Sequence, residues 1–314
     1  MGIVRIAVLS SLSCLAVVAL PRTRFFWGLL WAAILFAGGR TLKRSQLAGL
    51  LVFNIALLYL LYPGHGQLYY ILVAGLSGLV MGMLHGDGAG YVNIRRGGMA
   101  AGLLGATIFL GVILSVVSPL SLAGLQGEAQ AFAASMAQQA REAGILDVYA
   151  QSGLAMTELE ALLNVVAEWI AFHMPGFLYL EALAMVFLSL TLGTFIVRRE
   201  SEVRRKPFVQ EQMPWPLIWL VILGLGLVIW GYDARNLLYY LGSNILLVLT
   251  PLAVYFGLAV AFYRFRLSAG PWRTVGLGIF ILMVLLFPNY IFILLAVVGL
   301  FDALIDYRHL RQTS

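Results

Sequence analysis

Ten apolar runs follow one another along this chain, and no other feature restricts its fold as much. A helix rises about 1.5 Å per residue, so roughly 20 apolar residues cross the hydrocarbon core of a bilayer. Most of the runs approach that length, and a water-soluble fold would leave their surface uncovered. The runs are residues 3–20, 25–38, 47–62, 68–84, 99–117, 177–197, 217–230, 237–262, 275–287 and 290–304.

This pattern predicts an all-α integral membrane protein, a polytopic helix bundle of about nine or ten spans. Only 11% of the residues are charged, whereas about 25% are charged in soluble proteins. Runs 25–38, 275–287 and 290–304 are short for a crossing, so we expect them to be tilted, kinked or re-entrant. The lower count applies if the last two runs form one helix broken at Pro288, and the higher count if they form a hairpin.

The positive charges indicate the orientation, because Lys and Arg are enriched in cytoplasmic loops. The N-terminus and the C-terminus are both expected to be cytoplasmic. Arg5 before an apolar run resembles the start of a signal peptide, but no small-x-small cleavage site follows, so we expect a first membrane helix. This orientation leaves four arginines outside, namely Arg22, Arg24, Arg141 and Arg235.

Residues 121–174 differ from the rest of the chain, since they contain six acidic residues and one arginine. We expect an extracytoplasmic insertion of amphipathic helices, one over 126–143 and a second that starts near the capping-box spacing of Thr157 and Glu160. The apolar stripe of the second helix is expected to lie on the membrane surface or to cover the bundle. The chain then divides into N-terminal membrane helices at 1–120, the insertion at 121–174 and C-terminal membrane helices at 175–314.

Glycines recur at every fourth residue where the fourth apolar run ends and where the fifth begins. Small residues at this spacing let helix backbones approach closely. We therefore expect these two spans to pack on each other or on a partner rather than to hold a ligand. The helix-packing glycines are Gly78, Gly82, Gly86, Gly98 and Gly102.

Polar residues inside apolar runs are costly in hydrocarbon and indicate functional positions. Glu181 and Asn244 are the candidate ligand-binding residues, because each lies within a long run. Asp302 and Asp306 are four residues apart on one helix face, where Arg308 can neutralise them, so we expect a structural salt bridge there. Asn54 and Asn289 complete the set of intramembrane polar residues.

No pattern of an enzyme or of a metal site is present. The four histidines are scattered, Cys14 is the only cysteine, and neither a His-Glu-x-x-His nor a Gly-x-Ser-x-Gly sequence occurs. The glycine-rich residues 85–90 lack a phosphate-loop pattern and are expected to form a cytoplasmic loop. The formal charge of +6 lies in loops between apolar runs rather than in a nucleic-acid footprint. We expect no catalytic residue, metal, cofactor or nucleic-acid partner.

Motifs in the C-terminal half resemble those of the YybS-like family of predicted bacterial membrane proteins, a family of unknown function. The resemblance covers residues 175–311, and fewer motifs match before it. It rests on Met174-Pro175-Gly176, on Pro207-Phe208 followed by Pro214-Trp215-Pro216, on Asn244 before Tyr255-Phe256-Gly257-Leu258-Ala259, on Phe287-Pro288-Asn289, and on Gly299-Leu300-Phe301-Asp302 followed by Asp306-Tyr307-Arg308.

That family is similar at fold level to the S components of energy-coupling-factor importers, which bind vitamins or metal ions within a small helix bundle. The resemblance implies uptake of a small solute across the cytoplasmic (inner) membrane of a bacterium, with Glu181 and Asn244 lining a cavity. It also implies an energising transporter module as partner. The alternative is a membrane scaffold for envelope, cell-division or sporulation partners, which would use the basic cluster at 198–206 to recruit another membrane protein or anionic lipid.

Overall fold

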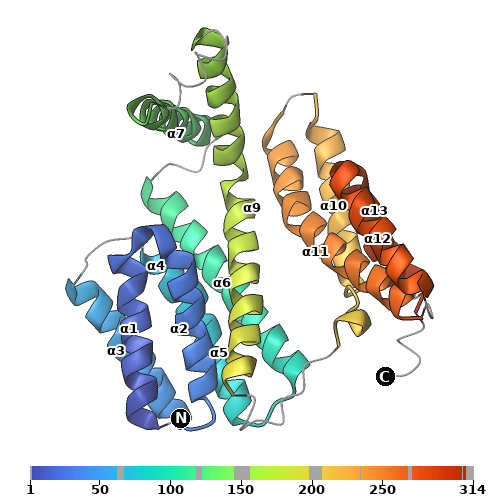
Figure 1. Ribbon diagram of the computed structural model, residues 1–314. Coiled ribbons are helices and arrows are strands. Elements are labelled where there is room, and N and C mark those ends of the chain that lie inside the picture. Colours follow the sequence, from blue (N-terminus) through green and yellow to red (C-terminus); the bar gives the residue numbers. More distant parts are fainter. Residues whose placement is uncertain are drawn as a thin grey trace. The chain divides into compact units, whose positions relative to one another are not determined.

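A computed structural model describes residues 2–61, 67–117, 122–144, 156–197, 207–233, 235–267, 271–305 and 307–308. The regular elements in these ranges are all helical, and the described residues of the ten apolar runs lie almost entirely in helices (Figure 1). The prediction of a polytopic all-α membrane protein is confirmed. A helix suits hydrocarbon because it pairs its own backbone N–H and C=O groups.

The chain folds as two compact units, each with its own buried apolar core. Unit 1 comprises Met1–Pro119 and Leu178–Arg205, and unit 2 comprises Leu120–Phe177 and Lys206–Ser314. The boundary falls inside one continuous helix, α9 (Met156–Ile196).

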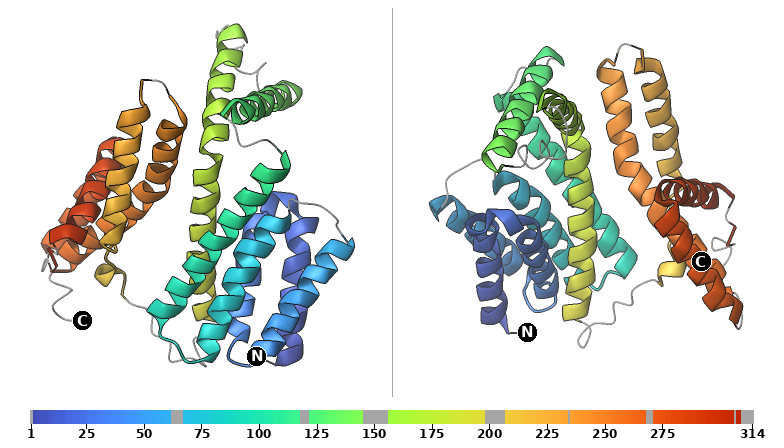
Figure 2. Two further views of the ribbon diagram at one scale, coloured as in Figure 1. Left: turned by 180° about the vertical axis from the view of Figure 1, so that it is seen from behind. Right: turned by 45° about the horizontal axis from the view of Figure 1, so that its top comes forward.

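Unit 1 is a bundle built around a bent helix pair. Helices α1 and α2 pack against each other with a bend of 112° between them. Helix α5 then packs on both α2 and α6, as the two views in Figure 2 also show. The elements of this unit are α1 (Ile3–Ala19), η1 (Pro21–Thr23), α2 (Arg24–Gly38), α3 (Arg44–Leu61), α4 (Leu68–Tyr70), the π-helical η3 (Ile71–Gly75), α5 (Leu76–Gly86), α6 (Tyr91–Val117) and residues 178–196 of α9.

Unit 2 is organised around its longest membrane helix, α11, which packs against α10 on one side and α13 on another. Helices α12 and α13 are separated by one residue, Phe287, at the break before Pro288 that the sequence indicated. The elements are α7 (Leu122–Glu142), residues 156–177 of α9, η4 (Phe208–Gln210), α10 (Pro216–Gly231), α11 (Leu237–Leu267), α12 (Pro271–Leu286) and α13 (Pro288–Ile305).

Within the described ranges, six helices are long and apolar enough to cross a membrane, or up to seven if α1 and α2 together form one broken span. This count is lower than the nine or ten that follows from counting every run. The difference arises because α1, α2, α10 and α12 have 15 to 17 residues. Helices of that length extend about 24 Å, which is less than the roughly 30 Å of a hydrocarbon core.

The predicted acidic insertion forms two helices. The first is α7, and Gly144 follows its end with a positive φ of 67° and an N–H bonded to the Arg141 carbonyl. The second does not stop before the sixth apolar run. It continues through Pro175 as the single helix α9, in 41 residues.

The glycines of the fourth run lie against α2. A Cβ atom on Gly78 would lie 2.8 Å from the Ala32 Cα, and one on Gly82 would lie 2.6 Å from the Leu35 carbonyl oxygen. Gly86 faces the Gly39 carbonyl in the same way. The absence of side chains thus allows α5 and α2 to approach with their backbones in contact.

The two glycines of the fifth run face other partners. Cβ atoms added there would lie 2.6 Å from Met81 Cγ at Gly98 and 2.8 Å from Val186 Cγ2 at Gly102. These glycines therefore leave room for side chains of α5 and α9 to pack against α6, rather than for a helix backbone.

Replacing Gly82 by Ala is expected to lower the free energy of unfolding by about 1–3 kcal/mol, because the methyl group would overlap the α2 backbone. The measurement is thermal unfolding of the purified protein in detergent. Gly49→Ala on α3 is the matched control, since no atom lies within 4 Å of its added Cβ. Equal melting temperatures for the two variants would contradict the close contact of α5 with α2.

Candidate functional site

Glu181 lies on the part of α9 that belongs to unit 1, and its side chain is half-buried. Its Oε1 atom accepts a hydrogen bond of 3.2 Å from the Tyr70 hydroxyl. That is its one hydrogen bond within the ranges the structure describes, and no described Lys or Arg forms an ion pair with it. One neutral hydrogen-bond partner offsets only a small part of the free energy that a carboxylate loses on leaving water.

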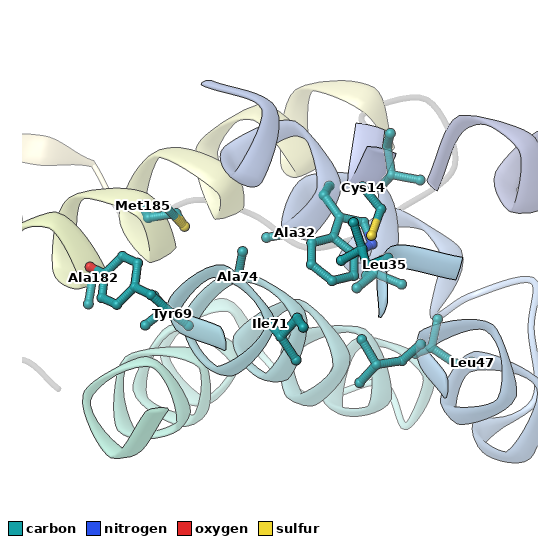
Figure 3. Packing of buried hydrophobic residues seen from close by; sticks show 14 of the residues in the cluster. Cys14, Ala32, Leu35, Leu47, Tyr69, Ile71, Ala74, Ala182 and Met185 are labelled. Atoms are coloured by element: carbon teal, nitrogen blue, oxygen red, sulfur yellow. The ribbon is translucent and has the colours of Figure 1, made fainter. Parts of the chain in front are cut away.

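Hydroxyl groups surround the same stretch of α9. The Tyr69 hydroxyl donates to the Leu178 carbonyl at 2.8 Å, and the hydroxyls of Tyr179 and Thr107 are 2.9 Å apart. Figure 3 shows Tyr69 beside Ala182, with Met185 further along α9. Helices α4, α6 and α9 therefore meet through a polar contact set in an otherwise apolar bundle.

Two local features position Tyr70. The π-helical segment Ile71–Gly75 follows it directly, and such widened turns in α-helices occur frequently at functional sites. On α2, Gly28 leaves room for its ring, because a Cβ there would lie 2.9 Å from Tyr70 Cδ1. Arg24, one turn earlier on α2, is near enough for its charge to act on Tyr70. The group thus sits where α2 and α4 begin, at one end of unit 1.

Asn244 on α11 has a different environment, since its side chain bonds to the backbone of α9. Its Oδ1 atom accepts from the Gly176 N–H at 2.7 Å, and its Nδ2 atom donates to the Phe172 carbonyl at 3.0 Å. In an unbroken helix these two backbone groups would bond each other, because they are four residues apart. The Asn244 amide is therefore inserted into the hydrogen-bond ladder of α9.

Pro175 explains why this insertion is needed. A proline inside a helix has no N–H, and its ring pushes away the carbonyl of the preceding turn. Neighbouring helices can then supply partners for the freed backbone groups in a membrane protein. Asn244 also donates to Tyr240 O at 2.8 Å, so both of its amide hydrogens are used.

His173 strengthens the same junction, although no sequence motif singles it out. Its Nδ1 atom is 2.7 Å from the Trp169 carbonyl, and its Nε2 atom is 3.1 Å from the Ser243 hydroxyl. Phe172 stacks on Tyr240 with ring centroids 4.2 Å apart. The position of His173 two residues before Pro175 is the only sequence signal that could have pointed to it.

The structure places the two predicted ligand-binding residues in different units, Glu181 in unit 1 and Asn244 in unit 2. The other intramembrane polar residues are distributed as follows. Asn54 is buried and bonds to Ser10 and Ser11 of α1, whereas Asn289 is exposed in the first turn of α13. Among the described residues, no group of three or more His, Cys, Asp or Glu side chains could hold a metal ion.

Asp302 and Arg308 form a buried ion pair at the end of α13. Their side chains are 1% and 0% exposed, and Arg308 Nη2 is 2.6 Å from Asp302 Oδ2. Arg308 also donates to the carbonyls of Val209 at 2.6 Å and Glu211 at 2.7 Å, both in the segment before α10. The pair thus fastens that segment to α13. Asp306 and the basic cluster at 198–206 lie outside the described residues.

Replacing Asn244 by Leu is expected to destabilise the protein, because the Gly176 N–H and the Phe172 carbonyl would lose their partners. The expected cost is on the order of 1–3 kcal/mol per group. Asn244→Asp should be intermediate, since a carboxylate accepts from Gly176 but cannot donate to Phe172. Thermal unfolding in detergent measures both, with the exposed Asn93→Leu as control. An unchanged melting temperature in Asn244→Leu would show that α9 closes its own ladder at Pro175.

Replacing Arg308 by Met is expected to cost about 3–5 kcal/mol, because it leaves the Asp302 carboxylate buried without its cation. Adding Asp302→Leu should recover part of that loss, but not the part due to the Val209 and Glu211 carbonyls. Urea or thermal unfolding of the two single variants and the double variant gives the coupling energy. The exposed Arg266→Met is the control. Strictly additive losses would contradict a direct pair.

Comparison with known proteins agrees with this architecture. Neither the curated proteins nor the solved structures contain a match to this chain. A family model described as "Predicted membrane protein (DUF2232)" matches residues 8–303. Because that match covers nearly the whole length and both units, the chain belongs to the DUF2232 family of membrane proteins.

Proposed function

We propose that the protein binds a small, positively charged solute at Glu181 in unit 1. The observation that carries the proposal is the half-buried Glu181 carboxylate, which has a neutral hydroxyl as its hydrogen-bond partner among the described residues. An ionisable group inside a membrane segment is a functional position by default. A cationic ligand would supply the missing counter-charge.

The surroundings of Glu181 suit such a ligand. Aromatic rings attract cations through their faces, and Tyr69 and Tyr70 lie edge to face with centroids 5.3 Å apart. Hydroxyl groups of Tyr70, Tyr179 and Thr107 can orient a polar solute by hydrogen bonding. Asn244 is not needed in this site, because its amide is engaged with the α9 backbone.

The family resemblance supports binding of a solute rather than catalysis. The YybS-like family, whose motifs this chain resembles, is similar at fold level to importer S components. Those proteins bind vitamins or metal ions and work with an energising module. We extend this to uptake across the inner membrane of a bacterium, with both termini cytoplasmic. The site would then face outward, because Tyr70, the partner of Glu181, lies against Gly28 near the start of α2. Ile6, near the N-terminal end of α1, lies instead against Gly38 at the end of α2.

Glu181→Gln tests the proposal, because the amide keeps the shape of the side chain and removes its charge. The purified protein is screened by thermal shift in detergent against monoamines, diamines, quaternary ammonium compounds and divalent cations, with neutral sugars and carboxylates as the comparison set. We expect at least one cationic probe to raise the melting temperature of the wild-type protein. The same probe should bind Glu181→Gln about tenfold more weakly, or weaker still.

Glu168→Gln is the matched control, since Glu168 is an exposed carboxylate on the same helix. It should respond to the cationic probe as the wild-type protein does. Two outcomes would refute the proposal: no stabilisation by any cationic probe, or equal stabilisation of the wild-type protein and Glu181→Gln.

A further inference from the structure

One end of unit 1 carries a ring of basic side chains, which we call the basic rim. It consists of Arg5, Arg40, Lys43, Arg44, Arg95 and Arg96, with Asp87 as its acidic member. Arg5, Arg40, Lys43, Arg44 and Arg96 are exposed, and Arg95 is half-exposed. These residues come from three helices, α1, α3 and α6, and from the loops after α2 and α5, so the charge is gathered by the fold rather than by one stretch of sequence.

Contacts between the helix ends hold the basic rim together. Arg44 at the start of α3 donates through Nε to Asp87 after α5 at 3.0 Å. Gly39 after α2 lies directly against Gly82 and Gly86 of α5. At the start of α6, the Arg95 guanidinium lies over the Tyr91 ring, 5.8 Å from its centroid.

The basic rim coincides with the ends of three candidate membrane spans. One span begins at Arg44, one ends at Gly86 and one begins at Tyr91. Residues at the end of a span lie at the level of the lipid headgroups. At the opposite end of the unit, where α1 meets α2, the basic residues are Arg22 and Arg24.

We propose that the basic rim is a binding site for the headgroups of anionic phospholipids. The argument is charge complementarity at the correct depth. Six cations and one anion leave an excess positive charge, part of which the salt bridge of Arg44 with Asp87 neutralises. Clusters of four to eight Lys and Arg residues next to a membrane helix bind anionic lipid, because each positive side chain is attracted to the lipid surface. The four exposed cations Arg5, Arg40, Lys43 and Arg96 are sufficient for a cluster of this kind. The site depends on exposed charges, so salt weakens it.

The test uses the full-length protein in nanodiscs or detergent with phosphatidylglycerol, and with phosphatidylcholine as the uncharged comparison. Native mass spectrometry counts the lipids retained, and thermal shift reports the stabilisation that each lipid gives. We expect phosphatidylglycerol to be retained in preference to phosphatidylcholine. In the double variant Arg40→Gln/Lys43→Gln the affinity for phosphatidylglycerol should fall roughly tenfold. These two positions leave the Arg44–Asp87 pair intact.

The matched control is Arg22→Gln/Arg235→Gln, which removes two exposed arginines away from the basic rim. It should retain phosphatidylglycerol as the wild-type protein does. Competition with inorganic phosphate at constant ionic strength separates a headgroup site from a site for the free anion, because millimolar phosphate then displaces only the latter. Equal retention of both lipids, equal loss in both double variants, or displacement by phosphate would overturn the proposal.

Discussion

The structure depends on one constraint, that hydrocarbon offers no water to backbone N–H and C=O groups. Each membrane segment therefore has to pair those groups within the protein. Most of the chain meets this requirement by being helical. Where proline interrupts a helix, the freed groups need another donor and acceptor. Asn244 provides both to α9 after Pro175, and this is why a helix of 41 residues can contain a proline and still run on.

The same constraint separates the polar side chains into two kinds. Asn244 and Arg308 form hydrogen bonds with backbone groups of other segments, and Asn54 forms them with the hydroxyls of α1. Their presence in apolar surroundings follows from the need to join elements. Glu181 differs, because a single Tyr70 hydroxyl does not offset the cost of a buried carboxylate. Structural need explains the first group but not Glu181, which is why our proposal places the ligand there.

The helical class and the positions of the helices could be predicted from the sequence, because run length and hydropathy are local properties. The break between α12 and α13 could be located at Pro288 for the same reason. Local signals failed at Pro175. The expected boundary between the insertion and the membrane helices fell between residues 174 and 175, but the partner that keeps α9 continuous there lies 68 residues away in α11. The nine or ten spans expected from the runs exceed the six candidate spans among the described residues, because a run of apolar residues does not show whether its helix is long enough to cross.

Side-chain pairing required information that sequence spacing does not contain. The separation of six residues between Asp302 and Arg308 was compatible with a pair, yet nothing local indicated that Arg308 would also reach the carbonyls of Val209 and Glu211. Tyr70 was overlooked because a tyrosine at the start of an apolar run is ordinary for a membrane helix. Its role depends on Glu181, which is 111 residues further along the chain. In a protein whose helices are interchangeable by composition, the rare long-range polar contacts are therefore what define which helices meet and where chemistry can occur.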